Sequence, residues 1–318
     1  MPSSTGRARR FRNGVTERVT RPLLLLLAVL GPPASLAVRD AGGWREWWWA
    51  VRAPARWESA LPAVANAVEW RPLAPGARWG ELRLSGEGAA WRIRVILVEL
   101  DPGRVRLETV SLRRPDGRPR RWSVDSAPAG AIVALNAGQF TSSGPWGWLV
   151  SGGEERRAPG SGPLAPALVV DTAGAIRLVP PDSIAALRGD PAVREAFQSY
   201  PSLLMENGEI PRALREPGLG VDLEHRDARL ALGLDRDGRL LIAMTRFEGL
   251  GGVLSNLPFG LTTPEMAALM GALGCRRAVL LDGGISSQLR LAPGDGETLV
   301  WRGLRQVPLG LVALPAGD

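Results

Sequence analysis

Short stretches typical of β-strands, separated by tight turns, recur along the chain from residue 92 onward. The first, Arg92–Leu100, begins with alternating residues, and Val105–Leu112 is predicted to be its partner across Asp101-Pro102-Gly103. The turns at 206–208 and 235–238 contain Asn-Gly and Asp-Gly, which hairpins favour because glycine accepts a positive φ. Further strands are expected at 131–135, 167–171, 176–179, 202–206, 230–235, 240–245, 277–281, 287–291 and 309–314.

Helical patterns are fewer. The clearest covers Pro264–Leu273, where Thr262 is the expected N-cap and Glu265 completes a capping box. Shorter helices are expected at Pro181–Arg188 and Pro191–Gln198. Many strands with few helices predict an α+β fold with a single main domain, in which a mixed, mostly antiparallel sheet is packed by a few helices.

The first 38 residues have the organisation of an export signal. Six Arg and one Glu lie in residues 1–21, the apolar run Leu23–Leu30 follows, and Ser35 and Ala37 fit the −3 and −1 positions of a cleavage site. The apolar run is shorter than the ~20 residues of a spanning helix, but its extension through Val38 leaves an uncleaved membrane anchor open. Either outcome places the protein outside the cytoplasm: extracellular, periplasmic or anchored to the outer membrane face.

Tryptophan and proline are concentrated between the signal and the strands. Six of the twelve Trp fall within residues 44–70, which fits either an aromatic belt at a membrane surface or a short amphipathic helix packed on the domain. The proline-rich composition predicts that 39–80 is a linker. Residues 81–318 are then the main domain.

The charge and the rare residue types exclude several functions. The net charge is +7, of which residues 1–21 hold +5, so the remainder carries 7 − 5 = +2. A nearly neutral body argues against a nucleic-acid partner. The single cysteine, Cys275, excludes an intrachain disulfide and a multi-cysteine metal cluster, and the single histidine, His225, excludes a His-rich zinc site.

The strongest local signal is an apolar strand that runs into an acidic glycine turn, Leu281-Asp282-Gly283-Gly284-Ile285-Ser286-Ser287. Such a strand end presents a carboxylate at a rigid edge, and the glycines leave N–H groups free for oxyanions. Taken alone, this pattern fits a solvated turn equally well. Four other motifs accompany it: N-A-G-Q-F at 136–140, R-L-A-L-G at 229–233, G-L-T-T-P-E-M-A at 260–267 and R-Q-V-P at 305–308.

In this order the five motifs resemble the phosphodiester glycosidase family, over about residues 90–316. The chain departs from the family pattern at Gln139, where the family has Phe, at Leu230, where it has Thr, and at Ile285, where it has a third Gly. A β-branched side chain resists the positive φ that glycine allows, so Ile285 is expected to alter the site. The resemblance implies an exported hydrolase that cleaves a sugar-1-phosphodiester or a related envelope glycan linkage.

Three residues are the candidates for catalysis. Asp282 is the expected chemical carboxylate, as base, nucleophile or electrostatic stabiliser. Arg229 matches the arginine of the family's motif, and a guanidinium binds phosphate bidentately. His225 has a side chain suited to acid–base work, but its charged surroundings favour a solvated loop residue, and the family does not supply its role.

Candidate substrate-binding residues surround these three. Asn136 is expected to orient substrate or to hold its loop, and Trp148 to stack on a sugar or to fill the core. The others are Gly138, Gly283, Gly284, Ser286, Ser287 and Arg305. No metal-ligand set is evident, although a divalent cation, Ca²⁺ or Mg²⁺, at Asp282 is left open. Two rival functions remain: a non-catalytic glycan- or phosphate-binding domain of the same fold, and a structural envelope protein.

Overall fold

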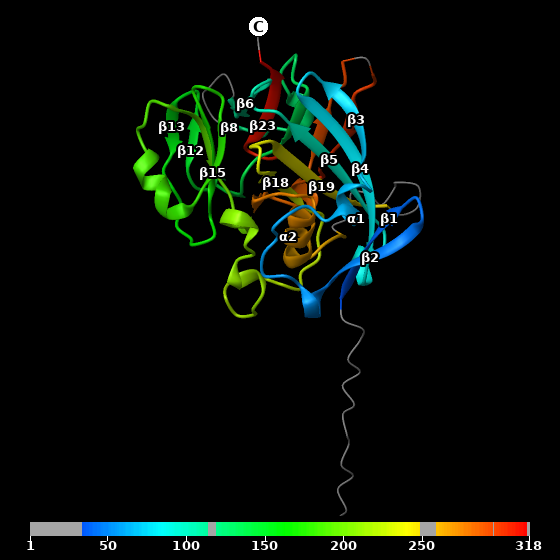
Figure 1. Ribbon diagram of the computed structural model, residues 1–318. Coiled ribbons are helices and arrows are strands. Elements are labelled where there is room, and N and C mark those ends of the chain that lie inside the picture. The colour runs from blue at the N-terminus through cyan, green and yellow to red at the C-terminus, as the bar shows by residue number, and fades with distance from the viewer. Residues whose placement is uncertain (1–33, 114–118, 249–258, 295, 317–318) are drawn as a thin grey trace, which may run out of the picture. The chain divides into compact units, whose positions relative to one another are not determined.

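The computed structural model describes residues 34–113, 119–248, 259–294 and 296–316 (Figure 1). Most of the predicted export signal, residues 1–33, lies outside the described residues. The described residues belong to one compact unit that spans 33–318. Among them, no helix is long and apolar enough to cross a membrane.

The largest element is a nine-stranded sheet in which every pairing is antiparallel. Its strands, in spatial order, are β17 (Ser202–Leu204), β20 (Arg277–Leu280), β18 (Leu230–Leu234), β19 (Leu240–Phe247), β5 (Ile93–Leu100), β4 (Ala77–Gly86), β1 (Ser35–Asp40) and β2 (Gly43–Trp49), with β3 (Glu69–Ala74) paired to β4. The start of β18 therefore lies beside the end of β20, because Ala231 pairs with Leu280.

Two five-stranded antiparallel sheets complete the architecture. One has the order β13 (Glu154–Arg157), β12 (Leu149–Ser151), β16 (Val193–Gln198), β14 (Ala167–Asp171) and β15 (Ile176–Val179). The other has the order β22 (Leu299–Trp301), β21 (Leu289–Leu291), β9 (Val133–Asn136), β23 (Gly310–Pro315) and β6 (Val105–Val110). Short ribbons pair β10 (Phe140–Thr141) with β11 (Gly144–Pro145), and β7 (Leu112–Arg113) with β8 (Pro119–Arg120).

Helix is scarce in the described part of the chain. The α-helices there are α1 (Pro62–Ala65) and α2 (Thr263–Ala272), and α2 starts with the predicted capping box of Thr262 and Glu265. Short 3₁₀ turns cover Ala50–Arg52, Gly88–Ala90, Val124–Ser126, Pro181–Leu187, Glu206–Gly208, Arg212–Leu214 and Gly284–Ser286. The predicted α+β class with a mixed sheet is therefore wrong, because the protein is mostly β and built from several antiparallel sheets.

Alternation along β5 explains how the sheets share the core. Ile93, Val95 and Leu97 belong to the buried cluster that contains α2, whereas Ile96, Val98 and Leu100 belong to the cluster formed with the five-stranded sheets. Successive side chains of a strand point to opposite faces, so a strand covered on both faces is apolar throughout. Helix α2 is also enclosed by the protein on all sides, since nine of its ten residues are buried, and a helix in such a place is apolar around its whole circumference.

Two local predictions fail for reasons of tertiary pairing. Val105–Leu112 does not pair with β5, because β6 pairs with β23 while β5 lies between β4 and β19. Pro191–Gln198 is not a helix; its residues from Val193 form β16, between β12 and β14. The sequence of β16, V-R-E-A-F-Q, contains good helix formers, and ladder partners on both sides override that preference.

The segment 39–80 is folded and is not the predicted linker. It contains the end of β1, the whole of β2 and β3, and the start of β4, all of them in the nine-stranded sheet. Leu36 and Val38 of β1 are fully buried, so cleavage after Ala37 would divide a strand of the core. Because β1 begins at Ser35, an anchor that extends through Val38 is also incompatible with this fold.

Candidate active site

The loop that follows β20 forms one wall of an open pocket of about 310 Å³. The other walls come from the segment after β9, from the residues just before β18 and from the segment that precedes β23. The pocket is lined by Phe140, Thr141, Ser142, Asp227, Asp282, Gly283, Gly284, Ile285, Ser286 and Arg305. Five predicted site residues, Asp282, Gly283, Gly284, Ser286 and Arg305, are thus brought together.

Asp282 presents a partly desolvated carboxylate at the end of β20. Its Oδ2 atom is buried and has no hydrogen-bond partner among the described residues. Burial raises the pKa of Asp282 above its ordinary value, while a hydrogen bond with Ser286 and the positive charge of Arg305 act in the opposite direction. A carboxyl group in this setting binds a proton more readily than an exposed aspartate does, as is common for carboxylates at functional sites.

Asn136 holds the acidic loop from both sides. Its side-chain Nδ2 donates to the carbonyl of Asp282 at 2.8 Å, and its Oδ1 accepts from the N–H of Gln288 at 3.0 Å. Because Asn136 is buried and does not line the pocket, the second of its two predicted roles, holding the loop, is the one its contacts support. Gly138, at a φ of 63°, accepts a hydrogen bond from the Asp282 N–H at 3.2 Å.

The two glycines allow close approach of the loops. A methyl group on Gly283 would lie 2.5 Å from the carbonyl oxygen of Ala228, and Gly284 adopts a φ of 56°. The backbone at Ile285 does not require glycine, because its φ is not positive: among the described residues other than glycine, only Asn207 has a positive φ. The strain expected for a β-branched side chain at 285 is therefore absent, and Ile285 lies exposed at the pocket rim.

Asp227 is a second carboxylate in the pocket, and sequence reasoning did not select it. Its Oδ1 accepts the N–H of Ala228 at 2.8 Å, and His225 Nε2 lies 3.7 Å from its Oδ2. Burial raises the pKa of Asp227, against the lowering effects of that N–H and of the charges on Arg229 and His225. The signal that the sequence offers is the position of Asp227 just before the apolar strand β18. That position places Asp227 near Asp282 only because β18 pairs with β20.

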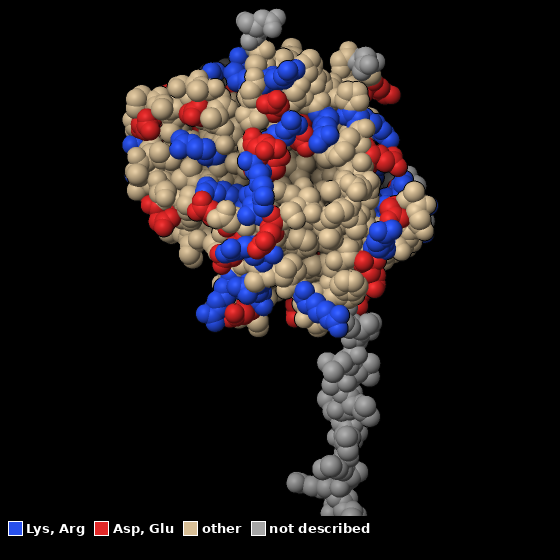
Figure 2. Space-filling model, in the orientation of Figure 1, with Lys and Arg blue, Asp and Glu red and all other residues tan. Residues whose placement is uncertain are grey.

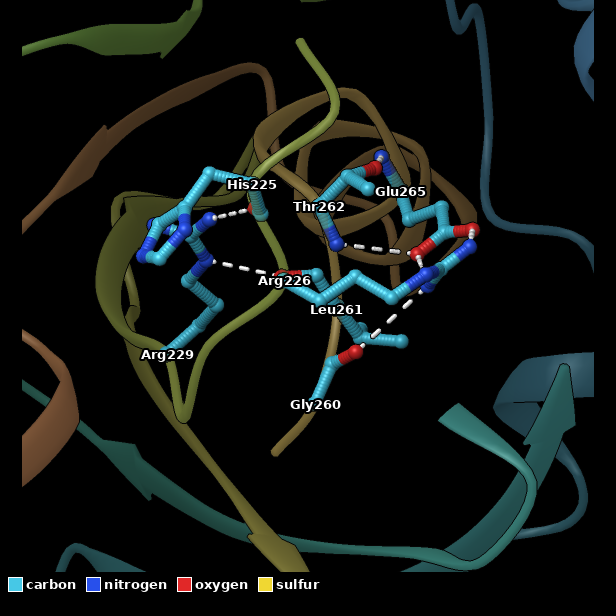
Figure 3. Close-up of polar contacts among 7 residues, drawn as sticks. All are labelled: His225, Arg226, Arg229, Gly260, Leu261, Thr262 and Glu265. Carbon is cyan, nitrogen blue, oxygen red and sulfur yellow. Dashed lines mark hydrogen bonds and ion pairs between the residues drawn. The ribbon is translucent and has the colours of Figure 1, made fainter. Parts of the chain in front are cut away.

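Two arginines fix the loop that carries Asp227 (Figure 3). Arg226 makes a bidentate ion pair with Glu265, at 2.5 and 2.8 Å, which ties the loop to the N-terminus of α2. Arg229 donates from Nε to the carbonyl of Leu261 at 2.8 Å and from Nη2 to the carbonyl of His225 at 2.5 Å. These contacts restrict the loop on both sides of Asp227.

Arg229 and His225 do not line the pocket, and their catalytic roles stay predictions. Nε and Nη2 of Arg229 donate to backbone carbonyls, and the residue does not line the pocket. His225 also lies outside the pocket lining; its side chain is 61% exposed and reaches Asp227 from the solvent side. Both residues therefore touch the site through the Asp227 loop.

Arg305 is the cation that faces the pocket. Its guanidinium carbon lies 4.8 Å from the ring centroid of Phe140, and its backbone N–H donates to the carbonyl of Ile285 at 3.0 Å. The cation–π contact fixes the side chain beside Asp282, whose pKa it lowers. A guanidinium held in this way is suited to a phosphate oxygen.

Two other predicted binding residues lie away from the pocket. Trp148 fills the core beside β16, and its ring N–H donates to Glu155 at 3.0 Å, so stacking on a sugar is not available to it. Ser287 is fully buried, and its carbonyl accepts from the buried Arg246. Trp148 directly precedes the buried residues Leu149 and Val150 of β12, which explains its burial better than a loop over the site does.

No group of three or more His, Cys, Asp or Glu with metal-binding geometry occurs among the described residues. Asp227 and Asp282 are a pair of carboxylates, and the divalent cation suggested at Asp282 stays a prediction.

Comparison with known proteins agrees with the motif pattern. The pattern of the phosphodiester glycosidase family matches residues 129–313. The catalytic domain of zebrafish N-acetylglucosamine-1-phosphodiester α-N-acetylglucosaminidase, auto-inhibited by its pro-peptide, has a similar fold, with a TM-score of 0.55 and 18% identity. That likeness covers 80% of this chain and 86% of the zebrafish chain.

A hypothetical protein from Synechocystis is also similar, with a TM-score of 0.52 and 15% identity over 77% of this chain. This chain spans 63% of the length of the Synechocystis protein. No curated protein matches the sequence. Identities this low show the shared fold, whereas the sequence pattern covers more than half of the chain and includes the loops that form the pocket. The chain therefore belongs to the phosphodiester glycosidase family.

Proposed function

We propose that this protein is an exported hydrolase that cleaves the bond between a sugar and a phosphate in a sugar-1-phosphodiester or a related envelope glycan. The observation that carries the proposal is the presence of two carboxylates with raised pKa values, Asp227 and Asp282, in one open pocket beside Arg305. Paired carboxylates are the usual machinery for opening a glycosidic bond.

The reaction assigns a task to each group. The bond from the anomeric carbon to the phosphate oxygen breaks, water supplies the oxygen of the new bond, and the water's proton passes to a carboxylate. Asp227 and Asp282 supply that base and the negative charge that stabilises the positively charged anomeric carbon. Arg305 neutralises the phosphate monoester as it leaves.

Export is the part of the proposal that rests on the N-terminus. The arginine-rich and apolar segments precede β1 in the order of a signal peptide. Since β1 belongs to the sheet, we place cleavage before Ser35.

On the face shown in Figure 2, basic and acidic side chains are interspersed, as expected for a protein that does not bind a polyanion.

The test is turnover of a panel of sugar-1-phosphodiesters, including the N-acetylglucosamine ester, by the full chain with EDTA, Ca²⁺ or Mg²⁺. Asp227→Asn and Asp282→Asn should each lower kcat by roughly 10²–10⁴-fold. Glu154→Gln, at an exposed residue of β13, is the control and should leave the rate unchanged. Binding of the panel without turnover would contradict the proposal and favour a non-catalytic binding domain.

A further inference from the structure

Apolar side chains gather on one side of an otherwise polar pocket. Ile285 lines the pocket with 43% of its surface exposed, and Leu304 is 63% exposed. The segment that carries Leu304 runs along the acidic loop, because the Arg305 N–H binds the Ile285 carbonyl and a methyl group on Gly303 would lie 2.9 Å from the same oxygen. We call the side chains of Ile285, Leu304 and Phe140 the apolar rim.

The apolar rim lies next to the only arginine that lines the pocket in the described structure. Leu304 precedes Arg305 in the chain, and the Arg305 guanidinium covers the ring of Phe140 at 4.8 Å. A phosphate bound by Arg305 would therefore have the apolar rim beside it, in a pocket that also holds the carboxylates of Asp227 and Asp282. The two ester groups of a phosphodiester would meet surfaces of opposite character.

Exposed aliphatic side chains favour an aliphatic neighbour. Covering them with hydrocarbon removes apolar surface from water, whereas covering them with a sugar removes the water that hydrates its hydroxyl groups. Ile285 strengthens the argument, because it stands at a position where the family pattern has glycine and its backbone φ does not demand any particular residue.

We propose that the apolar rim selects phosphodiesters in which the second ester group is an aliphatic alcohol, so that the substrate is a glycosyl phosphate linked to a hydrocarbon chain. The proposal rests on the proposed function and specifies the substrate class of the same site. The sugar lies toward Asp227 and Asp282, the phosphate at Arg305, and the chain across Ile285 and Leu304.

The test compares two esters of one sugar-1-phosphate, one made with octanol and one with the C6 hydroxyl of a hexose. The full-length protein should show a higher kcat/KM for the octyl ester. Ile285→Ser and Leu304→Ser should each lower kcat/KM for the octyl ester by roughly three- to tenfold, and lower it less for the hexose ester. Val51→Ser, at an exposed aliphatic residue of the 3₁₀ turn after β2, is the matched control and should change neither.

Equal rates for the two esters, or equal losses for both in the rim variants, would overturn the proposal. If neither ester is hydrolysed, the proposed reaction fails. Calorimetric binding of the octyl ester then tests separately whether the apolar rim binds the hydrocarbon chain. Binding weakened by Ile285→Ser and unaffected by Val51→Ser supports the apolar rim. Absence of binding, or equal binding by both variants, refutes it.

Discussion

A methyl group on Gly284 would lie 2.5 Å from Oδ2 of Asp227, so the acidic glycine loop and the Asp227 loop are in direct contact. The contact joins residues that are more than fifty positions apart in the sequence. It also explains why the loop needs glycine at 284, since the φ of 56° and the neighbouring carboxylate both exclude a side chain.

Gly284→Ala should abolish turnover and destabilise the protein by about 1–3 kcal/mol. The alanine would be held in the left-handed backbone conformation of Gly284, and its methyl group would displace Asp227. Gly294→Ala is the control: a methyl group there meets no atom within 4 Å, and the backbone is not left-handed. Thermal unfolding and turnover of both variants measure the difference. Equal behaviour of the two variants would show that the loops are not in contact.

Asp282→Asn should raise stability at neutral pH while removing activity. The pKa of Asp282 is raised above its ordinary value of 3.8 in the folded protein. Folding therefore takes up a proton in the pH window between the pKa of the unfolded chain and the higher pKa of the folded protein. The wild-type protein is most stable below this window and loses stability as pH rises through it. Melting temperatures of the two proteins should therefore differ at pH 7 and converge below about pH 4. A variant that melts below the wild type at pH 7 would contradict the raised pKa.

Arg226→Gln should cost about 3–5 kcal/mol, because it leaves the buried Glu265 carboxylate without its bidentate partner. Arg212→Gln breaks an exposed ion pair with Glu216 and should cost less than about 1 kcal/mol. Denaturant unfolding compares the two. The Arg226→Gln variant should also lose turnover, since the Asp227 loop is no longer tied to α2. Activity retained in a folded variant would show that this tie does not position Asp227.

A fragment that begins at residue 81 should fail to fold, whereas one that begins at residue 34 should be stable. The shorter fragment lacks β1, β2 and β3 and exposes the core contacts of Leu82 and Leu84. Circular dichroism and proteolysis of both fragments test the difference. The same argument predicts that, if the N-terminal segment is cleaved, mass spectrometry finds the new N-terminus before Ser35. A cooperative fold in the shorter fragment would restore the linker interpretation.

Local pattern was a good guide to individual strands and to α2. The bounds of β14 and β15 agree with the prediction, as does the capping box at Thr262, because alternation, turn residues and caps are properties of neighbouring residues. The fold class was wrong for a different reason. Residues 39–80 are rich in Trp and Pro but pair as strands, and Val193–Gln198 takes its conformation from partners distant in sequence.

The same distinction between local pattern and long-range pairing applies to the candidate site. Asp282 was found because its motif is contiguous, and Asn136 because it belongs to a short motif. Asp227 was missed because its approach to Asp282 depends on the register of β18 with β20, which no local pattern specifies. The phosphate-binding role of Arg229 stays a prediction; its Nε and Nη2 bind backbone carbonyls, and the residue does not line the pocket.

The order of the strands has a consequence for how the chain matures. β5 pairs with β19, and β9 pairs with β21 and β23, so strands from the first half of the chain need partners from its last third. Such distant pairings slow folding, because loop closure must precede the contacts that reward it. The sheets cannot close until the C-terminal strands have been synthesised. A chain of this topology therefore brings the loops of the pocket together only at the end of its folding, after nearly all of the chain has been made.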